Sequence, residues 1–141
     1  MMRRLLILAV VAAAAGCGGQ HGPPVVAASV VVTGPAAAAP MAAGYLEISN
    51  RSGADIRITR VSSPQYESVE IHETVVEDDI ARMREIPALE IGRGETVVFE
   101  RGGKHLMLMK PVGTPGPVTL NFYSDDTLLL TVDTEFAATM D

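Results

Sequence analysis

Most of the chain alternates apolar and polar residues with a period of two, the pattern of strands that bury one face. No apolar stripe of helical period continues for three turns behind a helix cap. Eight or nine such segments, spaced at roughly ten residues and separated by Gly, Pro, Asn or Asp clusters, predict an antiparallel β-sandwich or barrel. The expected strands are residues 25–33, 45–49, 56–61, 69–73, 80–86, 96–100, 105–109, 118–123 and 128–132.

The first residues have the pattern of a targeting segment rather than of a folded element. A pair of arginines precedes an apolar run at residues 5–15, which is too short to span a bilayer, since a spanning helix takes about 20 residues. Small residues ending in Gly16-Cys17 resemble a bacterial lipobox. We therefore expect a signal peptide over residues 1–16, lipidation of Cys17, and an extracytoplasmic protein held at the membrane by lipid only. The alternative is an ordinary signal peptide cut near Ala15, which leaves a free thiol.

The length of 141 residues corresponds to one domain. We expect residues 17–24 to form a lipidated N-terminus and flexible tether, residues 25–136 the domain, and residues 137–141 a short tail. The formal charge of −6, from 17 acidic and 11 basic residues, argues against a nucleic-acid partner, because phosphate binding needs a basic surface.

Motifs of the common enzyme classes do not occur in the chain. The nucleophile elbow, the dinucleotide-binding glycines, the phosphate-binding loop and the paired histidines of zinc proteases are all missing. The acidic pairs Asp78-Asp79 and Asp125-Asp126 fall where turns are expected, and Asp often hydrogen-bonds the backbone there. We therefore interpret the protein as a non-enzyme.

Histidine and methionine are the residues that stand out. Residues 104–109 alternate strictly, so that Leu106 and Leu108 share one face of a strand and His105, Met107 and Met109 share the other. If the leucines fill the core, an imidazole and two thioethers lie together on the opposite face.

A second His and Met pair is predicted on the hairpin built from residues 70–86. A four-residue loop at residues 76–79 would set His72 opposite Met83, within reach of one metal ion. This register sets Glu73 opposite Arg82, which supports it, and Glu70 opposite Glu85, which counts against it. A bulge or a slipped loop therefore stays open.

Two imidazoles with two thioethers indicate a particular ion. Thioether sulfur is a poor ligand for Mg²⁺, Ca²⁺ or Zn²⁺ and a good ligand for Cu(I). A thiolate would oxidise outside the cytoplasm, so methionine is the suitable soft ligand there.

The spacing His72-x10-Met83-x21-His105-x-Met107 resembles the signature of the periplasmic copper chaperones of the PCu(A)C family. The resemblance covers most of the chain after the tether and implies a cupredoxin-like antiparallel β-sandwich that binds one Cu(I) through these four residues. It further implies delivery to the CuA centre of cytochrome c oxidase, sometimes with a thioredoxin-like thiol partner. The family pattern specifies Met107 rather than Met109, and the contributions of Met109 and Met41 stay open.

Three alternatives compete with copper delivery. They are a general copper storage or resistance lipoprotein, an electron-transfer cupredoxin, and a structural or interaction lipoprotein without metal. The electron-transfer alternative fits poorly, because it needs a cysteine thiolate in the copper site and the one cysteine is Cys17. For a carrier we expect an exposed, shallow site, which a partner approaches past the turn at Gly102-Gly103.

Overall fold

The computed structural model describes residues 24–36, 39–114 and 116–139, and this part of the chain is all-β. No helix in it is long and apolar enough to cross a membrane. The strands are β1 Val25–Gly34, β2 Met41–Asn50, β3 Ile56–Ile58, β4 Arg60–Ser62, β5 Tyr66–Glu77, β6 Ile80–Glu85, β7 Leu89–Ile91, β8 Thr96–Phe99, β9 Lys104–Pro111, β10 Val118–Ser124, β11 Thr127–Thr134 and β12 Phe136–Ala138.

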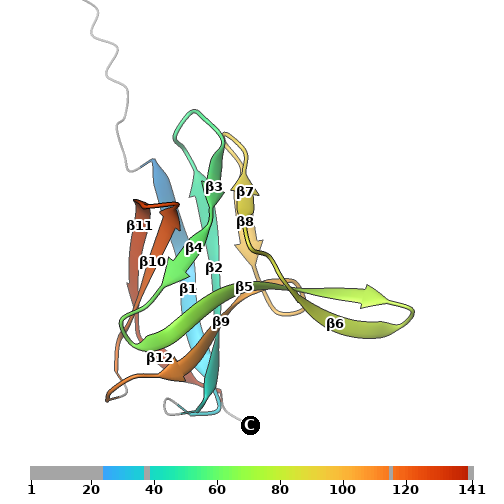
Figure 1. Cartoon of the computed structure of the whole chain (residues 1–141), viewed down its shortest axis with the longest axis vertical. Coiled ribbons are helices and arrows are strands. Elements are labelled where there is room, and N and C mark those ends of the chain that lie inside the picture. Colours follow the sequence, from blue (N-terminus) through green and yellow to red (C-terminus); the bar gives the residue numbers. More distant parts are fainter. Residues whose placement is uncertain (1–23, 37–38, 115, 140–141) are drawn as a thin grey trace, which may run out of the picture.

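Most strands belong to one sheet that curls over a single core (Figure 1). Its order is β11-β10-β4-β5-β9-β8-β2-β1-β12, and β6 pairs with β5 outside this path. The curl brings β11 against β1, where the Thr134 hydroxyl donates to the Val30 carbonyl at 3.2 Å. Most pairings are antiparallel, with short parallel ones between β1 and β12 and between β8 and β9. The predicted cupredoxin-like β-sandwich is confirmed.

The strand expected at residues 56–61 is two strands in different sheets. β3 pairs with β7 in a separate two-stranded sheet, whereas β4 pairs with β10 and β5. The chain passes from one sheet to the other at Thr59. Its backbone N–H donates to the Tyr123 carbonyl, and its hydroxyl accepts from the Asp125 N–H.

The sequence pattern also missed β7 and β12, and β12 extends two residues beyond the expected domain end at residue 136.

The hairpin of β5 and β6 projects from the sandwich as an arm (Figure 1). Its loop has two residues rather than the expected four, since Glu77 pairs with Ile80. Asp78 and Asp79 both have positive φ, 53° and 62°, as the tight turn that matches strand twist requires. The predicted pairing of His72 with Met83 is therefore wrong, and the pairing is shifted by two residues.

Both acidic pairs are turn residues, as expected. Asp78-Asp79 joins β5 to β6, and Asp125-Asp126 joins β10 to β11, where Ser124 pairs with Thr127. The expected signal peptide at residues 1–16, Cys17 and nearly all of the tether lie outside the described residues.

Candidate metal site

The pairing of β5 with β9 sets the two histidines directly opposite each other. His72 pairs with His105, and their ring centroids are 6.0 Å apart with a 49° angle between the rings. On the other face of the same strands, Ile71 pairs with Leu106, and both are buried in the core. The buried pair holds the register that brings the two imidazoles together.

Met107 lies beside His105 on the outer face of β9. The predicted alternation is confirmed, because Leu106 and Leu108 are 0% exposed while Met107 and Met109 are half-buried. Met107 pairs with Glu70 of β5, so it is two residues along the strand from the pair of histidines, at the next position on the same face.

Met83 lies on the same face as His72 but not opposite it. Met83 pairs with Thr74, and His72 pairs with Glu85. A shift of two residues keeps a side chain on its face, so Met83 becomes a diagonal neighbour of His72, and such neighbours are roughly 7–8 Å apart. Its side chain is 65% exposed. The four predicted ligands thus share one face, with Met83 at its outer edge.

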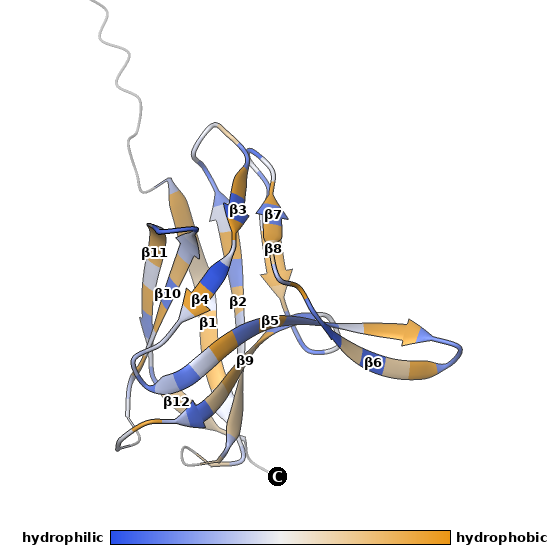
Figure 2. Cartoon of the chain, viewed as in Figure 1, coloured by the Kyte–Doolittle hydropathy of each residue, from blue (hydrophilic) through white to orange (hydrophobic). Residues whose placement is uncertain are grey.

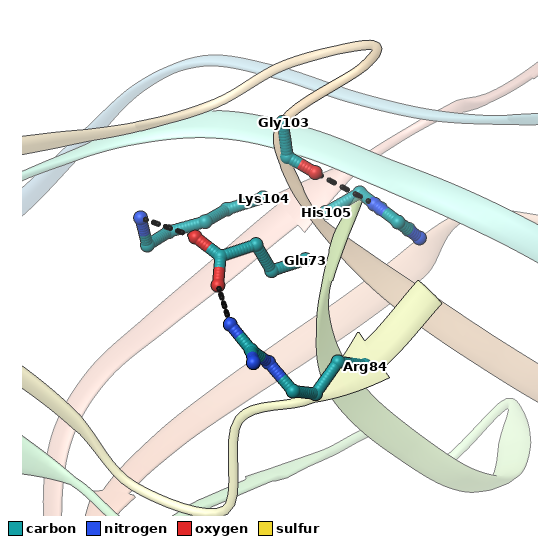
Figure 3. Close-up of polar contacts among 5 residues, drawn as sticks. All are labelled: Glu73, Arg84, Gly103, Lys104 and His105. Carbon is teal, nitrogen blue, oxygen red and sulfur yellow. Dashed lines mark hydrogen bonds and ion pairs between the residues drawn. The ribbon is translucent and has the colours of Figure 1, made fainter. Parts of the chain in front are cut away.

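The His105 ring is oriented by the turn that precedes it. Its Nδ1 lies 3.1 Å from the Gly103 carbonyl oxygen (Figure 3). The same oxygen also accepts the Thr74 N–H at 3.1 Å. A carbonyl only accepts, so Nδ1 carries the proton, and the Nε2 lone pair is available to a metal ion.

The His72 ring is oriented by a carboxylate. Its Nε2 lies 2.8 Å from a Glu70 oxygen, and an ionised carboxylate only accepts, so Nε2 carries the proton. The lone pair is then on Nδ1, which is buried and has no hydrogen-bond partner among the described residues. An unpaired buried nitrogen costs free energy, and a metal ion would relieve that cost.

Charged residues on the inner face fasten the base of the arm. One oxygen of the Glu73 carboxylate lies 3.4 Å from Lys104 Nζ of β9, and the other lies 3.4 Å from an Arg84 nitrogen of β6 (Figure 3). The predicted partner of Glu73 was Arg82, and the two-residue loop replaces it with Arg84. Glu73 therefore links the strand that carries His105 to the strand that carries Met83.

The exposure of the site is graded rather than uniform. His105 is 7% exposed, the His72 side chain is 18% exposed, and Met83 is 65% exposed. The expectation of an exposed, shallow site is therefore wrong for His105, which is covered because it lies where β5, β9 and the Gly103 turn meet. Met83 agrees with that expectation.

Sequence reasoning missed the two groups that orient the imidazoles. Each is an oxygen two residues upstream of its histidine, Glu70 before His72 and Gly103 before His105. Residues two apart in a strand share a face, so Glu70 was detectable from the alternation. The carbonyl of Gly103 depends on turn geometry and was not.

The donors fit a soft ion. Among the described residues, no three His, Cys, Asp or Glu side chains form a group that could hold a metal ion. The groups that the register brings to this face are two imidazoles opposite each other, with thioethers at neighbouring positions. This is a ligand set suited to Cu(I).

The family model described as "Putative lipoprotein LpqE-like" matches residues 24–134. The chain belongs to the LpqE-like family. No curated protein matches it in sequence.

The fold of this LpqE-like chain is also that of PCuAC domains. The copper-bound PCuAC domain from PmoF2 is 15% identical with a TM-score of 0.60, over 82% of this chain and 92% of that one. The apo form of that domain has a TM-score of 0.59 and the same 15% identity, over 82% of this chain and 89% of that one. The solution structure of apo-DR1885 from Deinococcus radiodurans is 24% identical with a TM-score of 0.59, over 99% of this chain and 96% of that one. The predicted resemblance is confirmed for the fold.

Replacing Glu70 with Ala should release the His72 ring. We expect His72 to change from the single Nε2–H tautomer to a mixture of tautomers, because the carboxylate that holds the proton on Nε2 is lost. Nitrogen-15 NMR of the imidazole measures this directly. Glu70→Gln should retain the tautomer, since an amide oxygen also accepts. Glu85→Ala is the matched control, because Glu85 pairs with His72 from the other side. A wild-type His72 that is already a mixture would contradict the assignment.

Proposed function

We propose that this protein is an extracytoplasmic copper carrier that binds one Cu(I) through His72, His105, Met107 and Met83. The observation that carries the proposal is the unpaired, buried Nδ1 of His72 opposite His105, whose Nε2 lone pair is also available. A structure with the same fold is described as a copper-bound PCuAC domain, which supports the choice of ion.

The roles of the four ligands follow from their positions. The imidazoles are held by hydrogen bonds and provide the fixed part of the site. Met107 adds a half-buried thioether, whereas Met83 on the projecting arm adds an exposed and exchangeable one. A carrier must give up its ion by replacing ligands in turn, and Met83 is the ligand that a partner reaches first. This graded arrangement fits transfer of a bound ion rather than catalysis.

The recipient that we propose is the CuA centre of cytochrome c oxidase, with a thioredoxin-like protein keeping its cysteines reduced. The family resemblance supports this choice, and general copper storage or resistance is the competing function. Lipidation of Cys17 would hold the domain close to the membrane in which the oxidase lies. The mass of the mature N-terminus tests that step, since an unmodified Cys17 would exclude a lipid anchor.

Anaerobic titration with Cu(I) against a chromogenic chelator tests the site. The protein is the chain from residue 17 with Cys17→Ser, because a free thiol would itself bind Cu(I). We expect one tight equivalent. His72→Ala and His105→Ala should weaken it most, by more than the roughly 10–100-fold typical of residues that only orient a ligand. Met107→Ala and then Met83→Ala should have smaller effects, because the exposed thioether is the least constrained.

The matched control for the arm is Ile80→Ala. Ile80 is 53% exposed on the same strand as Met83, but the alternation of β6 points it to the opposite face, so copper affinity should not change. If wild type never competes with the chelator, the carrier function fails, and the histidines are packing residues of an interaction domain. An intense blue colour with Cu(II) would instead favour electron transfer.

Delivery is tested by mixing the copper-loaded protein with the reduced apo form of the soluble CuA domain. We expect copper to move to that domain, because two thiolates bind copper more strongly than thioethers do. The separated proteins are assayed for copper. Retention of the copper on the donor protein would contradict delivery and leave storage as the function.

A further inference from the structure

Three methionines lie together on the outer face of β2 and β9, next to the proposed site. Met41 pairs directly with Met109, and Ala43 pairs with Met107 (Figure 1 shows the two strands). Directly opposed residues have Cβ atoms about 4.5–5.5 Å apart, and residues two apart on one strand share its face. The thioethers of Met41, Met107 and Met109 are therefore neighbours on one surface.

The packing of these strands gives the methionines no role in the core. The residues that alternate with them, Ala42, Leu106 and Leu108, are 6%, 0% and 0% exposed and fill the interior. Met41 is 50% exposed on the other face. Methionine is ordinarily an adaptable core residue, and an exposed methionine opposite a second one needs another explanation.

An open groove lies against two of these methionines, Met41 and Met107. It has a volume of about 270 Å³, and Met41, Met107, Tyr45, Arg101, Pro35 and Thr139 are among its lining residues. Met107 thus belongs both to the face that carries the histidines and to the wall of the groove. A ligand exchange at Met107 could move an ion from one to the other.

We propose that Met41, Met107 and Met109 form a second, all-thioether Cu(I) site through which the ion leaves the histidine site. Three neutral thioethers are a suitable ligand set for Cu(I). In the transfer, the bonds from copper to Met83, His72 and His105 break, and bonds to the sulfurs of Met41 and Met109 form. Met107 remains bound throughout. The ion stays Cu(I), so no electron or proton acceptor is required.

The charge in the groove makes this second site weaker than the first. Arg101 lines the groove, and its guanidinium carbon is 5.8 Å from the centroid of the Tyr45 ring. A fixed positive charge raises the free energy of a cation nearby. The all-thioether site is therefore occupied briefly, or when the histidine site is lost. Its role in transfer rests on the proposed function, whereas its ability to bind Cu(I) does not.

Carbon-13 NMR of the methionine methyl groups tests the site in the chain from residue 17 with Cys17→Ser, titrated anaerobically with Cu(I). In His72→Ala/His105→Ala protein we expect one weaker equivalent, which shifts the methyl signals of Met41, Met107 and Met109 together. Adding Met41→Leu and Met109→Leu should abolish it. These substitutions conserve volume, so the fold is retained. Ile80→Ala in the same background is the control, because Ile80 is an exposed apolar residue outside both proposed sites, and it should not change the binding.

The outcomes separate the two proposals. Methyl signals of Met41 and Met109 that do not move up to two equivalents of Cu(I), in either background, would overturn the second site. If wild type binds one tight equivalent in that case, the histidine site stands alone. In protein that retains both histidines, Met41→Leu/Met109→Leu should leave the affinity of the first equivalent unchanged and slow its transfer to a chelator. An unchanged rate would exclude the site from the transfer path.

Discussion

The antiparallel pairing of β5 with β9 is the constraint on which the candidate site depends. Its inner face pairs Val69 with Leu108 and Ile71 with Leu106, all of which are buried. A slip of one residue would turn these side chains to solvent and bring His72 into the core, so burial of apolar surface fixes the register. The opposition of His72 and His105 is a consequence of that hydrophobic register.

The orientation of the imidazoles depends on a second layer of contacts. Each ring is held by an oxygen two residues upstream that can only accept a hydrogen bond, a carboxylate for His72 and a backbone carbonyl for His105. Each hydrogen bond therefore decides which ring nitrogen carries the proton and which has the lone pair. The Gly103 carbonyl also accepts from Thr74, so the turn that orients His105 is tied to β5. Beyond the part of β5 that pairs with β9, the arm lies outside the sandwich and carries both apolar and polar residues (Figure 2).

The arm is the reason that the candidate ligands differ in their exposure to solvent. Its tight turn displaces Met83 by two residues from the position opposite His72, and the Glu73 ion pairs with Lys104 and Arg84 fasten the base of the arm to β9. His105 is buried, Met107 is half-buried and Met83 is exposed, and the two methionines lie on opposite sides of His72 along β5, level with Glu70 and Thr74. The pairing of β2 with β9 adds Met41 and Met109 on the same face.

The sequence by itself determined the all-β class, most strands, the face on which each side chain of residues 104–109 lies, and the four candidate ligands. These depend on period-two alternation and on spacing along the chain, which are local properties. Tertiary structure alone decided the partner of His72, the burial of His105, the break at Thr59 and the pairing of Met41 with Met109. Register follows from turn dihedrals and from contacts between distant strands, and the alternation is the same for a loop of two residues as for a loop of four. The alternation therefore placed Met83 on the same face as His72, while only the folded chain set its distance from His72.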